Sequence, residues 1–436
     1  MGTMIKLGPG YLKKFGVKRT CAAILLYASR KLDCRIDPYV ADKFLRKRSK
    51  RTAAGQLEIP SMRELSKYDF CRSDLVRNAQ ILDAWRRNTS RTISSVNWFI
   101  PDFLNVYGGG HHTIFRFAEY LARKGVENRF VIYDRSRPVD AEELEEAIVE
   151  AFPNMARFRV ITHPAVQGLP YADVAIASTW QSAYSVLHFN NTCGKYYFVQ
   201  DFEPIFYPAG SSYAMAEASY RFGFPAITFG RWLRDLYVQD YHGHGIDFTP
   251  CAETDLFYPA SDAPREKPER LFFFARPISE RRAFELGILA LRKLKKKYTN
   301  LEIMLAGWEI DEFKIPFRAR QLGNLTLRQT ASLYRRCDVG LCFSITNLSF
   351  LPLQLMASGC TPITNHGPNV EWLLKHNYNC VLTDTTPSTI SESIEETMND
   401  YELRKRIFNG GLETVRTTSW EREFDKVYDF MLRGEF

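Results

Sequence analysis

The sequence predicts an α/β protein made of two facing Rossmann-like domains behind a basic, mainly helical N-terminal extension. The chain has 436 residues, which exceeds one ordinary core and leaves room for two domains. From Ser95 onward, short β-rich runs alternate with amphipathic segments of helical length, as in a parallel sheet with crossover helices. A stretch rich in proline and charge at 260–270 interrupts this alternation once. We therefore expect one domain at 96–259 and a second at 260–418.

The extension, residues 1–95, accounts for the net positive charge of the chain. It holds 21 Lys and Arg against 8 Asp and Glu, although the whole chain has a net charge of only +8. Apolar residues at helical spacing in 75–85 predict a helix there. The basic cluster at 46–51 is compatible with peripheral contact with an anionic membrane surface and equally with a solvated linker or helix face.

Composition places the chain in a reducing compartment. We find no apolar run near the roughly 20 residues that span a bilayer, and no signal-peptide pattern. The nine cysteines form no CxxC pair, and their odd number leaves one unpaired in any disulfide scheme. The histidines and carboxylates form no HExxH or DxD motif. We expect a cytoplasmic protein, peripheral at most to the inner face of the membrane, without a catalytic metal.

The first domain is expected to contain six strands and at least three helices. The strands are predicted at 96–101, 130–134, 158–163, 173–179, 196–201 and 226–229, and the helices at 111–124, 213–222 and 231–241.

The second domain repeats the alternation. Strands are predicted at 271–275, 301–306, 339–344, 361–364 and 380–382, with helices at 282–297, 327–337, 352–358 and 390–399. The segment 419–436 follows with a further amphipathic helix. Because ligands bind beyond the carboxyl ends of parallel strands, residues that follow each strand are the candidate site.

A glycine run comes first among these segments. Gly108, Gly109 and Gly110 follow the opening strand and lead into the helix that starts at His111. Glycines allow close backbone approach, and a helix start attracts anions, so we assign the run to donor binding. A tight strand-to-helix turn is the alternative. The run lacks GxGxxG spacing, which disfavours a nicotinamide cofactor.

Two arginines follow the first strand of the second domain. Arg276 and Arg281 can both face one diphosphate, because guanidinium groups offer paired N–H donors to phosphate oxygens. A structural pairing of either arginine with a nearby carboxylate is the alternative.

The run 344–364 reads as strand, loop, short helix and strand, with the helix start turned toward the cleft. We expect its backbone N–H groups to bind phosphate and its polar side chains to bind sugar or ribose hydroxyls. The donor-binding residues predicted here are Ser344, Thr346, Ser349, Phe350, Leu351 and Gln354.

The strings FFFARPISERR, LAG, LGNLTLRQTASLYRRCDVGLCFS and LPLQLMASGCTPIT together resemble the donor-binding half of the retaining GT-B glycosyltransferases of family four. In that family a strand-end Arg and a following Lys bind the diphosphate, and an E-x7-E pair binds sugar and ribose. Arg276 matches the Arg, and Arg281 replaces the Lys. Thr346 and Gln354 replace the two acids. This departure leaves open either a donor with fewer hydroxyls or impaired catalysis.

The first domain resembles a narrower group. The strings NWFIPDFLNVYGGGHHTIFRFAEYLARKG, DVAIASTWQSAY, KYYFVQDFEPIFYPAGS and HGIDFTPCAETDLFYP look like bacterial rhamnosyltransferases of rhamnan or surface-layer glycan synthesis. The resemblance implies transfer of L-rhamnose from dTDP-β-L-rhamnose to a hydroxyl of a growing surface glycan. A lipid-linked acceptor remains open, as does the oligomeric state. The last helix is expected to cross back to the first domain.

The remaining candidates line the first domain's side of the cleft. Many members of the family place a His where this chain has Gln200. Asp201 and Glu203 follow it as candidates for positioning the acceptor hydroxyl or the donor. Trp180 and Gln181 offer a stacking face and a hydrogen-bonding group, with core packing of Trp180 as an even alternative. We assign His111, Trp180, Gln181 and Gln200 to acceptor binding.

For retaining members the resemblance implies front-side attack, in which the departing phosphate oxygen takes the acceptor proton. Arg276 and Arg281 would stabilise the leaving diphosphate without a metal or any other cofactor. Three rival functions stay open. They are a non-catalytic carbohydrate-binding or scaffold protein, a nicotinamide oxidoreductase and, least favoured, a nucleic-acid-binding protein, because the basic extension lacks interleaved aromatic residues.

Overall fold

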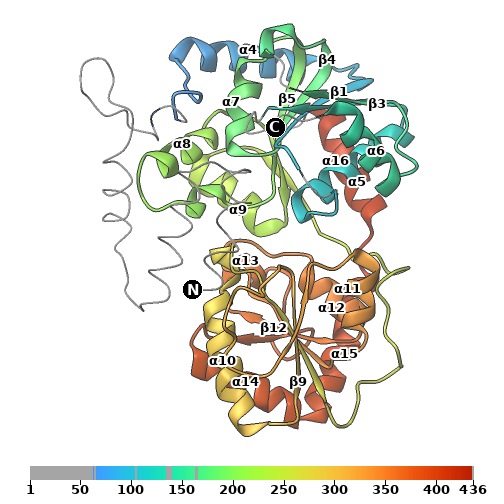
Figure 1. Cartoon of the computed structure of the whole chain (residues 1–436). Coiled ribbons are helices and arrows are strands. Elements are labelled where there is room, and N and C mark those ends of the chain that lie inside the picture. The colour runs from blue at the N-terminus through green and yellow to red at the C-terminus, as the bar shows by residue number, and fades with distance from the viewer. Residues whose placement is uncertain (1–61, 63–64, 104–105, 134–139, 163–164, 435–436) are drawn as a thin grey trace, which may run out of the picture. The chain divides into compact units, whose positions relative to one another are not determined.

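The structure is a computed structural model that describes residues 62, 65–103, 106–133, 140–162 and 165–434. The chain divides into two compact units, Met1–Asp69 and Phe70–Phe436. The helices and strands discussed below all belong to the second unit (Figure 1). The basic cluster 46–51 lies outside the described residues. Within the described residues, every helix is too short or too polar to cross a membrane.

Seven parallel strands form the first sheet, in the order β3-β2-β1-β4-β5-β6-β7. Every residue of the interior strand β1 is buried, as expected where helices cover both faces of a parallel sheet. The strands are β1 Ser95–Ile100, β2 Glu127–Ile132, β3 Phe158–Thr162, β4 Ala172–Ala177, β5 Thr192–Val199, β6 Ala226–Phe229 and β7 Gly245–Phe248. The connecting helices are α5 Gly109–Arg123, α6 Ala141–Ala151, α7 Trp180–His188, α8 Ser211–Ser219 and α9 Arg231–Tyr241.

Six parallel strands form the second sheet, in the order β10-β9-β8-β11-β12-β13. The strands are β8 Arg270–Phe274, β9 Glu302–Ala306, β10 Arg320–Gly323, β11 Val339–Leu341, β12 Thr361–Asn365 and β13 Val381–Thr383. The helices are α10 Phe284–Lys297, α11 Leu327–Tyr334, α12 Leu351–Ala357, α13 Pro368–Glu371, α14 Pro387–Asn399 and α15 Tyr401–Arg416. These two parallel sheets with crossover helices confirm the predicted fold class.

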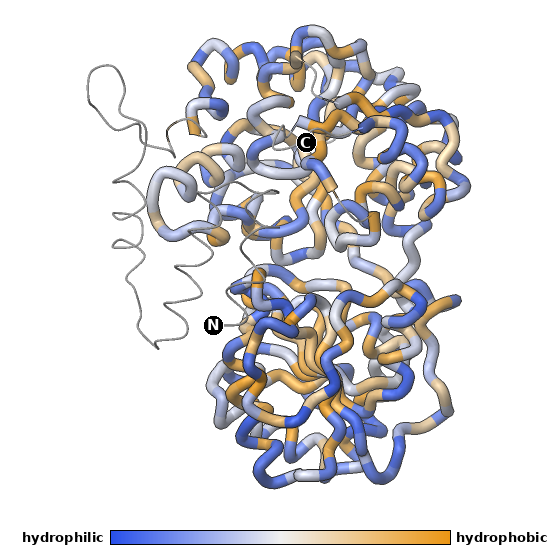
Figure 2. Tube along the Cα trace, in the orientation of Figure 1, coloured by the Kyte–Doolittle hydropathy of each residue, from blue (hydrophilic) through white to orange (hydrophobic). Residues whose placement is uncertain are grey.

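The core of the second sheet follows the alternation of side chains along each strand. In β8, Leu271 and Phe273 pack with α10 and α14 on one face, while Phe272 packs with α11 and α12 on the other. Hydrophobic residues accordingly concentrate along its strands (Figure 2). Both faces are therefore closed, and the strand ends are where this domain can receive a ligand.

Each sheet reverses its strand order once. The reversal lies between β1 and β4 in the first sheet and between β8 and β11 in the second. At such a switch point the two neighbouring connections run to opposite faces, which opens a crevice at the carboxyl ends of the strands. The glycine run follows β1, and the arginines follow β8. Sequence and topology therefore agree on where ligands should bind.

The beginning and end of the second unit both pack on the first sheet. Helix α4, Arg72–Arg87, lies against β5, and Trp85 Nε1 donates to the Tyr196 hydroxyl at 2.8 Å. That hydroxyl donates to the Met431 carbonyl of α16, Trp420–Arg433, at 3.1 Å. Phe424 of α16 stacks on Phe117 of α5, with 4.8 Å between ring centroids. Helix α4, assigned by sequence to the extension, is thus part of the first domain's packing.

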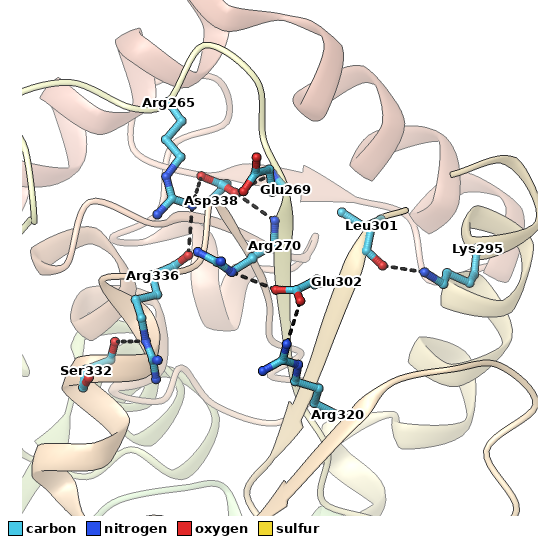
Figure 3. Close-up of polar contacts among 10 residues, drawn as sticks. All are labelled: Arg265, Glu269, Arg270, Lys295, Leu301, Glu302, Arg320, Ser332, Arg336 and Asp338. Atoms are coloured by element: carbon cyan, nitrogen blue, oxygen red, sulfur yellow. Dashed lines mark hydrogen bonds and ion pairs between the residues drawn. The ribbon is translucent and has the colours of Figure 1, made fainter. Parts of the chain in front are cut away.

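The amino ends of the second sheet carry a separate polar cluster (Figure 3). Asp338 accepts from the backbone N–H groups of Glu269 and Arg270 at 2.8 and 2.9 Å, which fixes the start of β8. Glu302 pairs with Arg270 and Arg320 at 2.9 and 2.8 Å. These basic residues are neutralised within the sheet edge, so the cluster is structural.

Some elements were predicted closely and others were missed. The limits of β6 and α9 agree with the prediction residue for residue. The structure adds β7 and β10, both edge strands of four residues, together with α6, α7, α13 and α15. Strand β5 starts four residues earlier than predicted and ends at Val199, so Gln200 and Asp201 lie in the loop after it. This correction places both residues at the ligand edge.

Gly287 tests the close approach of α10 to β8. A Cβ at this position would lie 2.1 Å from the ring of Phe273, which is fully buried and has no room to move. We expect Gly287→Ala to lower the stability by about 1–3 kcal/mol, despite the higher helix propensity of alanine. Thermal unfolding measures this, with Gly109→Ala as the control, because that site is open. Equal melting temperatures for both variants would contradict the close packing.

Candidate functional site

Loops from the carboxyl ends of the two sheets meet directly. Thr346, after β11, donates its hydroxyl to Asp201 Oδ2, after β5, at 2.8 Å. The side-chain amide of Asn347 donates to the carbonyls of Gln200 at 2.9 Å and Phe229 at 3.1 Å. Asn347 is 2% exposed, and its Oδ1 has no hydrogen-bond partner in the described residues. The junction is therefore polar, buried and only partly satisfied.

Arg281 reaches this junction from the second domain. Its Nε lies 3.7 Å from Asp201 Oδ2, and its guanidinium carbon lies 4.6 Å from the centroid of the Phe206 ring. In the described part of the chain, Nε is buried without a hydrogen-bond partner. The backbone is held as well, because Ile345 N–H donates to the Arg281 carbonyl at 3.1 Å.

Two further arginines stand beside it. Arg276 lies over the Trp308 ring at 5.7 Å, and its Nε is also buried without a partner among the described residues. Burial and the charge of Arg281 lower the pKa of Arg276. Arg282 donates to the Ser344 hydroxyl at 2.9 Å, and its pKa is lowered to about 10, mainly by burial and then by Arg281. Three like charges at one strand end favour an anionic ligand.

The local backbone explains how the arginines are presented. A 3₁₀ turn, Glu280–Arg282, follows the strand-end loop, and Ala283 then adopts a left-handed conformation with φ 46° at the start of α10. This reversal lets the turn lie across the end of β11 while α10 packs on the sheet. A left-handed non-glycine residue is unfavourable and is often found at functional sites.

The first domain contributes two largely buried carboxylates. Glu203 Oε2 accepts from the backbone N–H of Trp180, at the start of α7. Burial raises the pKa of Glu203 to about 8, and neighbouring Asp201 adds to the shift. The Asp201 side chain is 16% exposed, and burial raises its pKa against the opposing effects of Thr346 and Arg281. The raised pKa favours the protonated form of Glu203, in which the carboxyl group can donate a hydrogen bond as well as accept one.

The loop before α12 is only partly turned to the cleft. The Ser344 hydroxyl donates to the Ser349 hydroxyl at 3.4 Å, so these two candidates lie together. The Phe350 ring packs on Phe229 of the first domain at 5.1 Å. The ring therefore belongs to the domain junction, and the donor-binding role of Phe350 stays a prediction. Leu351 begins α12, and Gln354 is partly exposed on it.

The glycine run brings α5 close to β5. A Cβ at Gly110 would lie 3.3 Å from Gln200 Nε2, so glycine here lets Gln200 reach the start of α5. Gly109 faces open space, and Gly108 is the N-cap. His111 Nε2 lies 3.1 Å from the Pro101 carbonyl, and burial lowers its pKa. The structure thus brings Gly110, His111 and Gln200 to one edge.

The stacking role predicted for Trp180 does not fit its position. Its side chain is 4% exposed, and its indole N–H donates to the Tyr207 hydroxyl at 3.0 Å. The ring packs inside the first domain, because α7 begins at this residue and turns it inward. Gln181, the next residue, is partly buried. The alternative reading of Trp180 as core packing agrees with the structure.

Sequence reasoning missed three residues at the junction: Phe206, Arg282 and Asn347. Arg282 stood in the quoted string FFFARPISERR, and Phe206 and Asn347 lie close to predicted residues. The available signal for Asn347 was its place directly after Thr346, in the loop that follows a strand. Among the described residues, no three His, Cys, Asp or Glu side chains are grouped to hold a metal ion.

Two Rossmann-like domains whose strand ends meet in this manner form the GT-B fold of glycosyltransferases. Anabaena HepE, solved with UDP and glucose, matches with a TM-score of 0.62 at 12% identity, over 78% of this chain and 99% of its own. A glycosyltransferase from Rickettsia africae matches with a TM-score of 0.54 at 13% identity, over 79% and 99%. At these identities the likeness concerns the fold.

Both domains match models of one protein family. Residues 97–229 match the WsaF N-terminal domain, and residues 269–395 match the WsaF C-terminal domain, so the chain carries both domains of the WsaF family. The O-antigen biosynthesis protein RfbC of Myxococcus xanthus is 41% identical over 349 residues. That match covers 78% of this chain and 27% of the relative, so the chain spans about a quarter of the relative's length.

Glu203 predicts a pH dependence of stability. Its pKa rises from 4.5 to about 8 on folding, so the unfolded chain loses this proton at lower pH than the folded chain. Stability conferred by the protonated form is full below 4.5 and is lost as the pH rises toward 8. Glu203→Gln removes this loss. We expect its melting temperature relative to wild type to increase from about pH 5 to about pH 8.

The matched control is Glu143→Gln, on the exposed side of α6. Its melting temperature should differ from wild type by the same amount at both pH values. A Glu203→Gln difference that is equally independent of pH would show that Glu203 is ionised in the folded chain.

Proposed function

We propose that the chain is a glycosyltransferase that uses a nucleotide-sugar donor and binds the donor's diphosphate at Arg276 and Arg281. One observation carries the proposal. Both arginines follow the switch-point strand β8, and both present a buried Nε that has no hydrogen-bond partner in the described residues. Buried guanidinium N–H groups need an acceptor, and a diphosphate offers several oxygens at one place.

The donor we propose is dTDP-β-L-rhamnose. The first support is the resemblance of the first domain to rhamnosyltransferases. The second is the pair Thr346 and Gln354, which stand where the resembled family has acids. Thr346 already donates its hydroxyl to Asp201. A donor with fewer sugar hydroxyls would suit a site with fewer acceptors. HepE, the similar structure, holds UDP and glucose, a nucleoside diphosphate and a sugar.

The acceptor we propose is a hydroxyl of a growing bacterial surface glycan, consistent with the name of the Myxococcus relative. In this proposal transfer is retaining and independent of metal, as in the resembled family four. The arginines stabilise negative charge on the leaving diphosphate. Asp201, 3.7 Å from Arg281, faces the same space and positions the sugar or the attacking hydroxyl. Contacts between the domains would limit the access of water to the reacting groups.

Calorimetric titration with dTDP, UDP and GDP, each with and without Mg²⁺, tests the nucleotide site. We expect dTDP to bind best and without metal. Arg276→Ala should weaken dTDP binding by about 10-fold or more, because it removes a charge-assisted contact worth roughly 1.5–3 kcal/mol. The control is Arg292→Ala, which removes an exposed arginine of α10 and should bind normally.

Other outcomes of this titration decide against parts of the proposal. If UDP or GDP binds best, the proposed dTDP-linked donor is wrong, but the assignment as a glycosyltransferase stands. Binding only with Mg²⁺ would contradict metal independence. If none of the three nucleotides binds, the transferase function falls, and a non-catalytic carbohydrate-binding role, consistent with the missing acids, takes its place.

Asp201→Asn separates binding from turnover. The amide keeps an acceptor for the Thr346 hydroxyl but removes the charge that faces Arg281. With dTDP-rhamnose and a rhamnan acceptor, we expect kcat to fall by about tenfold or more, because a preorganised charge near the reacting atoms is lost. Dissociation constants for dTDP should change much less.

The control for this variant is Asp240→Asn, an exposed carboxylate at the end of α9. It should leave both constants unchanged. If Asp201→Asn has the same kcat as the wild type, the Asp201 carboxylate does not take part in the reaction.

A further inference from the structure

The loop after β5 holds the guanidinium of Arg281 from two sides. Asp201 Oδ2 lies 3.7 Å from Nε, and the Phe206 ring centroid lies 4.6 Å from the guanidinium carbon. Both belong to the first domain, whereas Arg281 belongs to the second. Arg281 of the second domain is thus held by two residues of the first domain.

From this geometry we propose that Phe206 is a positioning residue, which orients the Arg281 guanidinium for the donor diphosphate. The proposal rests on the diphosphate site proposed above and extends it. A guanidinium over an aromatic face is attracted to the ring while its N–H groups remain available at its edge. Phe206 therefore orients the N–H groups of Arg281 without accepting a hydrogen bond from them.

The position of Phe206 supports a role beyond packing. Its side chain is 37% exposed, although a phenylalanine gains most by full burial. The residue ends a 3₁₀ turn, Glu203–Phe206, with proline in its first turn, and this turn restricts the backbone that carries the ring. A partly exposed ring on a restricted turn, with a cation above it, is a defined contact between the domains.

An aromatic ring suits this place better than a closer acid. Arg281 has two cationic neighbours, Arg276 and Arg282, whose pKa values it lowers, so it needs an attractive partner to stay there. A carboxylate in full hydrogen-bond contact would cancel the charge that must meet the diphosphate. Asp201 stands beyond hydrogen-bond distance, at 3.7 Å. The ring supplies attraction and leaves the net charge intact.

The contact between Phe206 and Arg281 also links donor binding to the arrangement of the two domains. Phe206 and Arg281 belong to different domains, so their contact requires the domain arrangement that the structure shows. Diphosphate binding to oriented arginines then favours closure by the same free energy with which closure favours binding. Phe206 would couple donor binding to closure without contacting the donor.

The test is calorimetric titration of full-length variants with dTDP. Phe206→Leu keeps an apolar side chain and removes the aromatic face, and we expect the dissociation constant to rise roughly 3- to 30-fold. Phe206→Tyr keeps the face and should bind as wild type. In the Arg281→Ala background, Phe206→Leu should cause no further change, because the residue acts through Arg281.

Results that differ would overturn the proposal. Normal dTDP binding by Phe206→Leu would show that the aromatic face is not needed. An equal loss with and without Arg281 would show that Phe206 acts by packing alone. If the wild type binds no nucleoside diphosphate, the proposed function and the positioning role of Phe206 are both wrong. If binding needs Arg276 but not Phe206, only the positioning role is wrong.

Discussion

The hydrogen bond between Thr346 and Asp201 is the contact on which the site depends. A buried carboxylate is costly unless it is hydrogen-bonded or paired with a cation. Asp201 obtains both from the opposite domain, through Thr346 at 2.8 Å and Arg281 at 3.7 Å. Separating the domains would remove both partners and expose the carboxylate to water. The charge distribution at the cleft is therefore balanced only while the two strand-end loops are in contact.

The two ends of the second sheet show why an anion belongs at one of them. At the amino end, Glu302 and Asp338 neutralise the arginines around them. At the carboxyl end, Asp201 lies near Arg281 and Arg282, and among the described residues the buried Nε atoms of Arg276 and Arg281 have no hydrogen-bond partner. Positive charge left over inside a cleft attracts anions. The two ends carry similar residue types, and pairing alone distinguishes them.

Local sequence patterns predicted most helices and strands, but they could not predict contacts between residues far apart in the sequence. The alternation of apolar residues identified β6 and α9 to the residue. It missed β7 and β10, because each of these edge strands has a glycine and a charged residue among its four residues, which weakens the apolar signal. The strand-end rule located Arg276 and Arg281 because it depends only on order along the chain. The pairing of Asp201 with Thr346 joins residues 145 positions apart, and no local pattern encodes it.

That pairing also gives a physical reason for the departure at position 346. The resembled family has an acid there. In this chain the side chain at 346 points at Asp201, whose pKa burial already raises. A second carboxylate at hydrogen-bond distance would repel the first, and one of the two would have to take up a proton. A threonine donates a hydrogen bond instead. The acid missing from the second domain and the acid present in the first are thus two sides of one arrangement, in which the carboxylate near Arg281 comes from the opposite domain.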